Sequence, residues 1–138
     1  VIGDVNMGGD MDIVKIHSGS QVKGAITGAE TLWLVLDNAS AKSTALWEGN
    51  IDQSAFFGAK LQLDLNNAVI GVGKYTLMKD TDGSNDWTGT SFEMKFDGIS
   101  TDKTLVYGTA QSFADSPYEY ELKTDKSGKS LILAVTEK

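Results

Sequence analysis

Leucine recurs at every second position from Leu61 to Leu65, with polar residues in between. Such period-two alternation is typical of a β-strand that buries one face. Gly71 and Gly73 then interrupt the chain before residues 74–77, which carry the pattern of another strand. Upstream of this stretch the apolar runs are short and separated by glycine, and downstream they lengthen into alternating strands joined by polar turns. The pattern therefore predicts an all-β protein whose organisation changes near Leu61.

The first part of the chain carries short apolar runs and a weak internal repeat. Strands are expected at residues 13–16, 22–26, 32–36 and 44–47, the third of them apolar on both faces and therefore covered on both sides. Residues 22–26 (VKGAI) resemble residues 47–51 (WEGNI), and residues 13–16 resemble residues 34–36. The implied spacing of about 20 to 25 residues is typical of the stacked turns of a β-solenoid. A β-sandwich with strands spaced by roughly 8–12 residues would produce the same echo, so this alternative stays open.

Longer alternating strands make up the second part of the chain. Their apolar faces are formed by Tyr75 and Leu77; Phe92, Met94 and Phe96; Leu105 and Tyr107; Tyr118, Tyr120 and Leu122; and Leu131, Leu133 and Val135. Residues 125–128 (DKSG) are expected to form a hairpin loop between the last two strands, and residues 80–89 and 97–103 are expected to be surface loops. We therefore predict one continuous domain, with solenoid-like turns over residues 1–60 and an antiparallel β closing unit over residues 61–138.

The glycine-spaced part contains VKIHSGSQVKGAITG and LWLVLDNASAKSTALWEGNI, and the closing part contains GVGKYTL, TSFEMKF and YEYELKTDKSGKSLILAV. Together these five segments resemble the C-terminal part of an autotransporter passenger, a class of Gram-negative secreted proteins. The resemblance implies a right-handed β-helix that ends in an antiparallel capping unit with an autochaperone role, meaning that the unit promotes folding of the passenger. It covers most of the chain, but its motifs are degenerate β patterns without a catalytic signature. The sequence departs from the family in containing no convincing strands of a membrane barrel.

The resemblance also implies a location and partners. Passengers of this kind pass through their own outer-membrane barrel and reach the cell surface, so the chain would contact the rest of its passenger and the barrel. As part of an adhesin it would also contact a host surface or a glycan. The aromatic residues Phe92, Phe96, Tyr118 and Tyr120 would cover the end of the solenoid, where unpaired backbone groups otherwise favour aggregation, and would form an early folding nucleus.

The composition narrows the classes of function. The 138 residues carry a net charge of −7 and no arginine, and the 12 lysines form no run, which argues against a nucleic-acid-binding surface. No apolar stretch approaches the roughly 20 residues of a membrane helix, so direct membrane insertion is not expected. The absence of cysteine rules out disulfides and a thiol nucleophile, and it suits either a cytosolic protein or a secreted chain that stays unfolded during export. Because the first residue is Val1, the sequence is expected to be a mature piece or a fragment of a longer protein.

Candidate catalytic chemistry is sparse. His17 is the only histidine, so a catalytic triad or a histidine-based metal site would have to be built around it. Its place between an expected strand and the turn from Ser18 to Ser20 favours an ordinary surface or edge residue. We therefore predict a protein that is not an enzyme.

An acidic loop is the candidate metal site. Asp80, Asp82, Asn85 and Asp86 place hard oxygen ligands around Gly83, which suits calcium. Asp, Asn and Gly are also the expected residues of a solvated turn, so this interpretation stands beside the metal site. No cofactor other than calcium is indicated.

Tryptophan raises an alternative function. Trp87 lies in a loop and is the best candidate for exposure among the three tryptophans, whereas Trp33 and Trp47 lie in expected strands and should be buried. An exposed Trp87 that stacks on a sugar ring would make the chain a carbohydrate-binding β-sandwich module, calcium-dependent if the acidic loop binds the metal. The competing interpretation is a loop anchor that packs onto the sheet.

Overall fold

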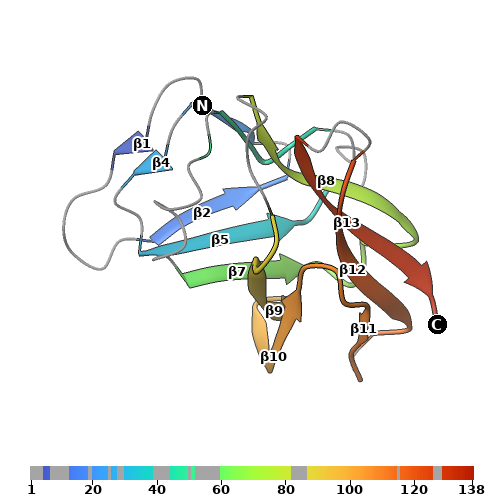
Figure 1. Cartoon of the computed structure of the whole chain (residues 1–138). Coiled ribbons are helices and arrows are strands. Elements are labelled where there is room, and N and C mark those ends of the chain that lie inside the picture. Colours follow the sequence, from blue (N-terminus) through green and yellow to red (C-terminus); the bar gives the residue numbers. More distant parts are fainter. Residues whose placement is uncertain are drawn as a thin grey trace.

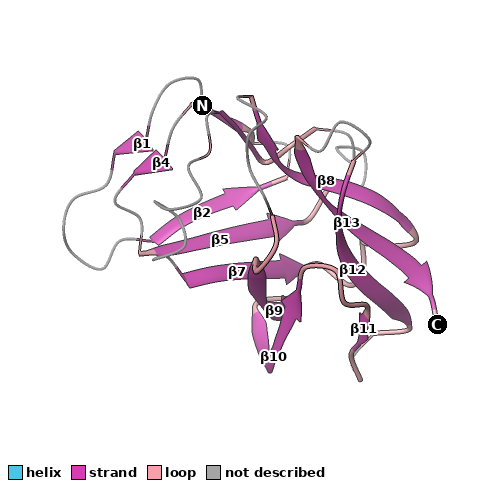
Figure 2. Cartoon of the chain, in the orientation of Figure 1, coloured by secondary structure: helices cyan, strands magenta, loops and turns pink. Residues whose placement is uncertain are grey.

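The computed structural model describes residues 5–6, 13–18, 20–24, 26–27, 30–38, 44–49, 51, 60–81, 87–114, 116–125 and 129–138. These residues form strands and turns, which confirms the all-β prediction (Figures 1 and 2). The strands are β1 (Val5–Asn6), β2 (Ile13–His17), β3 (Val22–Lys23), β4 (Ile26–Thr27), β5 (Thr31–Leu36), β6 (Trp47–Gly49), β7 (Lys60–Leu65), β8 (Gly73–Asp80), β9 (Ser91–Phe96), β10 (Ile99–Val106), β11 (Gln111–Ser112), β12 (Tyr118–Thr124) and β13 (Ser130–Glu137). A helix that is long and apolar enough to cross a membrane does not occur in this described part.

One mixed sheet has five strands in the order β10-β9-β7-β5-β2. Strands β2, β5, β7 and β9 pair in parallel, and β10 pairs antiparallel with β9. Ile13 lies beside Thr31, Thr31 lies beside Lys60, and further along Gln62 lies beside Glu93. Each strand of the parallel part therefore stacks on a segment that is far from it in the sequence.

The second mixed sheet has six strands in the order β11-β12-β13-β8-β6-β3. Strands β3, β6 and β8 pair in parallel, with Val22 beside Trp47 and Trp47 beside Met78. Strands β8, β13, β12 and β11 pair antiparallel in that order. A separate parallel pair joins β1 to β4.

The chain alternates between the two sheets from β2 to β9, since β2, β5, β7 and β9 belong to one sheet and the intervening β3, β6 and β8 belong to the other. The repeat between residues 22–26 and 47–51 is matched by the pairing, because Val22 lies beside Trp47 and Lys23 beside Glu48. The second repeat is out of register, since residues 13–16 pair with residues 31–34 and not with 34–36. The connections between stacked strands differ in length. Paired strands are therefore not separated by one fixed number of residues, and a repeat of constant spacing cannot match all of them.

Parallel pairing continues beyond residue 60, where the sequence pattern placed the change to an antiparallel unit. Both β7 and β9 pair in parallel with their neighbours, and β8 pairs in parallel with β6. Antiparallel pairing among the described strands involves β9 with β10 and the series β8, β13, β12 and β11. The predicted antiparallel pairing of the last two strands is confirmed, since Tyr118 lies beside Glu137 and Thr124 beside Leu131. Residues 126–128 of the predicted hairpin loop lie outside the described residues.

The segment 97–103, expected to be a surface loop, is instead a tight turn followed by a strand. Asp97 and Gly98 connect β9 to β10 with φ angles of 51° and 83°. Two successive positive φ angles are what a two-residue type I′ hairpin turn requires, and Asp-Gly is a favoured sequence for it. The loop prediction was wrong because it weighed the polar residues of this segment above its Asp-Gly signal.

The facing sides of the two sheets share one hydrophobic core. Its most enclosed side chains include leucines that are 0% exposed: Leu34 and Leu63 from the five-stranded sheet, and Leu77, Leu122 and Leu133 from the six-stranded sheet. Period-two alternation predicted the inward orientation of Leu63, Leu77, Leu122 and Leu133, whereas Leu34 lies in a segment that was expected to be covered on both faces. Full burial of such a side chain contributes roughly 1.5–3 kcal/mol, so the packed leucines are a principal source of stability.

Strand β7 is buried on both faces, although the alternation predicted a single buried face. Gln62 is 8% exposed and Asp64 is 5% exposed, on the side of the sheet that faces away from the core. The cover comes from tertiary neighbours, because Trp33 of β5 and the turn at Gly98 both contact Asp64. Side chains on a neighbouring strand and a distant turn are invisible to a period count along one strand.

Candidate functional site

Three aromatic rings meet inside the protein where the last parallel strand approaches the antiparallel strands. Phe96 belongs to β9, Tyr120 to β12, and Phe113 directly follows β11. The ring centroids lie 5.7 Å apart for Phe96 and Phe113, 5.8 Å for Phe96 and Tyr120, and 5.9 Å for Phe113 and Tyr120. Tilted and edge-on pairs at this spacing add roughly 0.5–1.5 kcal/mol beyond their buried area. The aromatic cluster therefore joins the two sheets at the point where their pairing changes direction.

The hydroxyl of Tyr120 has a defined partner within this cluster. It lies 2.5 Å from the hydroxyl oxygen of Ser116, which is 5% exposed. Burial raises the pKa of Tyr120 above its ordinary value, while the hydrogen bond with Ser116 acts in the opposite direction. The phenol therefore stays protonated where a free tyrosine would begin to ionise.

The structure brings most of the predicted aromatic residues of the closing unit into the core. Phe92, Phe96 and Tyr120 are 0%, 4% and 1% exposed, and Tyr118 is half-buried against the core. Phe113 was not singled out by the sequence reasoning because it follows a two-residue strand without alternation. It is the only aromatic residue between positions 108 and 117, and that isolation was the available signal. The role of these residues in capping and folding stays a prediction.

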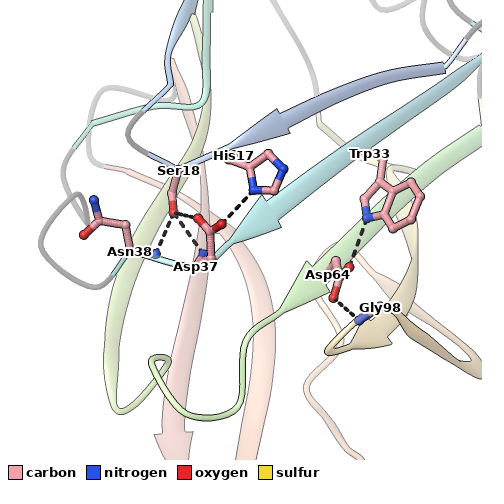
Figure 3. Close-up of polar contacts among 7 residues, drawn as sticks. All are labelled: His17, Ser18, Trp33, Asp37, Asn38, Asp64 and Gly98. Atoms are coloured by element: carbon pink, nitrogen blue, oxygen red, sulfur yellow. Dashed lines mark hydrogen bonds and ion pairs between the residues drawn. The ribbon is translucent and has the colours of Figure 1, made fainter.

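On the outer face of the five-stranded sheet, Asp64 connects three segments (Figure 3). Its Oδ1 accepts a hydrogen bond from the backbone N–H of Gly98 at 3.0 Å, and its Oδ2 accepts one from the indole Nε1–H of Trp33 at 3.2 Å. Donors to both oxygens compensate the cost of burying this carboxylate, which is 5% exposed. Asp64 thereby holds the turn between β9 and β10 against the parallel strands β5 and β7.

The indole of Trp33 is further held by two lysines. The ammonium groups of Lys15 on β2 and Lys95 on β9 each lie 4.2 Å from the ring centroid. Cation–π contacts of this kind contribute roughly 0.5–1 kcal/mol at exposed sites. Trp33 is only half-buried, so the expectation of a buried ring is corrected: the ring lies on the outer face and the lysines cover it. Trp47, which is 2% exposed, is buried as predicted.

His17, Ser18 and Asp37 lie together but do not form a catalytic triad (Figure 3). His17 Nδ1 is 2.7 Å from Asp37 Oδ2, and the Ser18 hydroxyl donates to Asp37 Oδ1 at 3.1 Å. The same hydroxyl oxygen accepts the backbone N–H groups of Asp37 at 3.0 Å and Asn38 at 2.9 Å. In a Ser-His-Asp triad the serine hydroxyl is hydrogen-bonded to the imidazole that serves as its base, whereas this serine contacts the carboxylate and two backbone amides. The contacts fasten the end of β2 to the end of β5.

The predicted calcium site is described only at its first residue. Asp80 ends β8 and is 0% exposed, and its Oδ1 accepts the backbone N–H of Ile51 at 3.2 Å. The expected place of Asp80 on a surface loop is therefore wrong, because its carboxylate serves a backbone group inside the protein. Asp82, Asn85 and Asp86 lie outside the described residues. Within the described ranges, no group of three or more histidine or acidic side chains is arranged to hold a metal ion.

The exposed tryptophan platform is not found. Trp87 is 2% exposed and belongs to the hydrophobic core, and the N–H of Thr90 donates to its carbonyl at 3.1 Å. Of the two interpretations of this residue, the loop anchor packed onto the sheet is confirmed. The loop prediction was right about the backbone but could not tell which way the indole points.

Comparison with known proteins adds no assignment. No protein-family model, curated protein or solved structure matches this chain. The resemblance to autotransporter passengers stays a prediction, and function is argued from the geometry.

Proposed function

We propose that this chain is the closing segment of a larger β-solenoid passenger that is secreted to the surface of a Gram-negative cell. Its role is structural and not enzymatic: the antiparallel strands cap the stack of parallel turns and assist its folding. Its partners are the rest of the same passenger and, during export, the outer-membrane barrel. The passenger as a whole serves as an adhesin towards a host surface or glycan.

The change of pairing direction at one end of both sheets carries this proposal. The five-stranded sheet runs in parallel from β2 to β9 and then adds the antiparallel β10. The six-stranded sheet runs in parallel from β3 to β8 and then adds β13, β12 and β11 in antiparallel pairing. A stack of parallel turns needs a terminal unit of different structure, because its last turn would otherwise present an open core and unpaired strand edges.

The outer strand β10 carries features that discourage further pairing. Its register with β9 breaks between Ser100 and Thr104, and Asp102 has a positive φ of 58°. The hydroxyl of Thr101 donates to the carbonyl of Met94 at 2.9 Å, a bond that the regular ladder would not contain. Bulges and charged residues on an edge strand are the usual means by which proteins prevent the addition of another strand. These features support β10 as the end of the stack.

The role in folding is supported by the aromatic cluster defined above. Phe96 comes from the last parallel strand and Tyr120 from the antiparallel hairpin, so their contact forms only when the closing strands meet the stack. Hairpins such as β12–β13 and β9–β10 have short connections and can form early, whereas parallel pairs must close longer loops. The closing strands are therefore the natural nucleus onto which the turns are added.

The carbohydrate-binding sandwich loses its main support. Its expected platform, Trp87, is 2% exposed and offers no face to a sugar.

A matched pair of core variants tests the capping and folding role. Leu133 on β13 and Leu34 on β5 are both 0% exposed, and replacing either with alanine should cost about 2–5 kcal/mol. If the closing strands form the nucleus, Leu133→Ala slows refolding, while Leu34→Ala mainly accelerates unfolding. Stopped-flow folding and unfolding rates across a range of urea concentrations measure both effects.

The two variants act as controls for each other, because residue type, burial and expected loss of stability are the same. A slower refolding of Leu34→Ala with an unchanged refolding rate of Leu133→Ala would show that the parallel turns fold first. That result would remove the folding role from the closing strands.

A further inference from the structure

A groove with a volume of about 720 Å³ crosses the outer face of the six-stranded sheet. It is lined by residues from β3, β6, β8 and the start of β13, together with the segments next to them. Grooves of roughly 300–1,000 Å³ are the size of small-molecule sites. The groove lies away from the aromatic cluster and from Asp64, so the capping role does not explain it.

Three lysines from distant parts of the sequence line this groove. Lys23 lies on β3, Lys79 lies on β8, and Lys129 directly precedes β13. The acidic residues in the described part of the lining are Glu48 and Asp125. This part of the lining therefore has more positive than negative groups, in a chain whose net charge is −7. A local excess of cations in an acidic protein is a feature that an anionic ligand recognises.

Glu48 occupies the middle of this charge arrangement. Strand pairing places it between Lys23 and Lys79, and its two carboxylate oxygens lie 3.7 Å and 3.5 Å from their ammonium groups. Both distances are longer than the 2.7–2.9 Å of a strong charge-assisted hydrogen bond. Both lysine side chains are also about half exposed, at 52% and 48%. The ammonium groups therefore stay accessible to a second anion.

We propose that this groove binds an anionic oligosaccharide. Its carboxylate or sulfate groups contact the ammonium groups of Lys23, Lys79 and Lys129, and its hydroxyls pair with the hydroxyls of Thr44 and Thr76 along the groove. Hydroxyl side chains both donate and accept hydrogen bonds, as sugar hydroxyls do.

The lining favours a saccharide over other anions. Among the described residues of the lining, Ala45 is the only aliphatic one and none is aromatic, so a ligand with large apolar groups gains little from this part of the groove. A bound peptide strand would need a free sheet edge. Glu48, Thr76 and Lys79 place the middle of the groove on β6 and β8, two strands that pair with neighbours on both sides. Inorganic phosphate would fill only a small part of 720 Å³.

Isothermal titration calorimetry with defined probes tests the proposal. The probes are trigalacturonic acid, a sulfated chondroitin tetrasaccharide, fully methyl-esterified trigalacturonate as the neutral analogue, a triglutamate peptide and inorganic phosphate. We expect at least one of the two acidic saccharides to bind more tightly than the ester, the peptide and phosphate. We also expect added salt to weaken its binding, because exposed charge pairs are screened.

Charge variants locate the site. Lys79→Met and Lys129→Met should each weaken saccharide binding about threefold, and Glu48→Gln should strengthen it about threefold by releasing two ammonium groups. Lys103→Met is the control, since it makes the same change in net charge on β10 of the other sheet. Circular dichroism and thermal unfolding establish that each variant is folded.

Each other outcome overturns the proposal. Failure of both acidic saccharides to bind at about 10 mM removes the site. Equal binding of the ester or tighter binding of triglutamate refutes an anionic sugar as the ligand. Loss of affinity in Lys103→Met equal to that in Lys129→Met places the binding elsewhere.

Discussion

Gly49 lies where two stacked parallel strands approach each other too closely for any side chain. A Cβ atom added at this position would lie 2.3 Å from the carbonyl oxygen of Gly24 and 2.8 Å from its carbonyl carbon. Cβ atoms essentially never approach another heavy atom within 3.0 Å, so Gly49→Ala would force β6 and the Gly24 backbone apart by about 0.7 Å. Both contacting atoms belong to the main chain, and no flexible side chain can move aside to make room.

The expected loss of stability combines two effects. Overpacking of this kind costs about 1–3 kcal/mol. The displaced carbonyl of Gly24 is also the acceptor for the indole N–H of Trp47 at 2.7 Å, and loss of that bond adds about 1 kcal/mol. We therefore expect Gly49→Ala to lower the free energy of unfolding by about 2–4 kcal/mol.

Urea denaturation, followed by circular dichroism, measures this difference. With a slope of about 2 kcal/mol per molar urea, the midpoint should fall by about 1–2 M. Gly71→Ala is the matched control, because the nearest atom to its added Cβ is the Tyr118 hydroxyl oxygen at 3.8 Å, an ordinary contact. The control should stay within about 0.5 kcal/mol of the parent chain. A Gly49→Ala protein as stable as the Gly71→Ala protein would refute the close stacking of β3 and β6.

Two further substitutions probe the polar contacts of the junction. Asp64→Asn replaces one acceptor oxygen with a donor, so either the Gly98 N–H or the Trp33 indole N–H loses its partner, at a cost of about 1–3 kcal/mol. Hydrogen exchange at the Gly98 amide should accelerate, and unchanged protection there would argue against this bond. Tyr120→Phe removes the hydrogen bond to Ser116 and should cost about 1 kcal/mol at neutral pH. The pKa of Tyr120 is raised in the folded state, so above about pH 10 the unfolded chain releases this proton while the folded chain retains it, and the parent protein loses stability. The unfolding free energies of the parent protein and of Tyr120→Phe, measured from pH 8 to 11, should therefore converge as the pH rises. A difference between the two that stays constant with pH would contradict the raised pKa.

Local patterns were sufficient for much of the fold. Alternation identified the inward faces of β7, β8, β9, β12 and β13, since the orientation of a side chain on a strand depends only on its own position. The same patterns predicted a surface loop at residues 97–103, where the chain forms a tight turn at Asp97 and Gly98 and then a strand. The Asp-Gly hairpin signal was present, but the polar residues around it were given more weight. The patterns left the orientation of Trp87 open, because a loop sequence does not determine whether its indole points towards the sheet or towards solvent.

The candidate sites depend more strongly on long-range contacts. Asp64 is part of an alternating strand, and nothing in its surroundings along the chain indicates that Trp33 and Gly98 would both donate to it. Likewise Lys23, Lys79 and Lys129 are separated by about fifty residues at each step, so the absence of a lysine run concealed their convergence on one groove.

Local sequence patterns establish that this protein is all-β, which residues form most of its strands, and which side chains of those strands face a core. These properties follow from the two-residue period of a strand and from the turn preferences of glycine and aspartate, both of which act over a few positions. The folded arrangement alone reveals the direction of pairing, the point where parallel stacking ends, and the grouping of charges on the outer faces. Those properties depend on contacts between segments such as β5 and β7, whose paired residues lie tens of positions apart in the sequence. The connections between such paired strands also differ in length. The physical reason is that hydrogen bonding and packing in a sheet are satisfied across strands, so they depend on which strands meet and not on the order of residues within one.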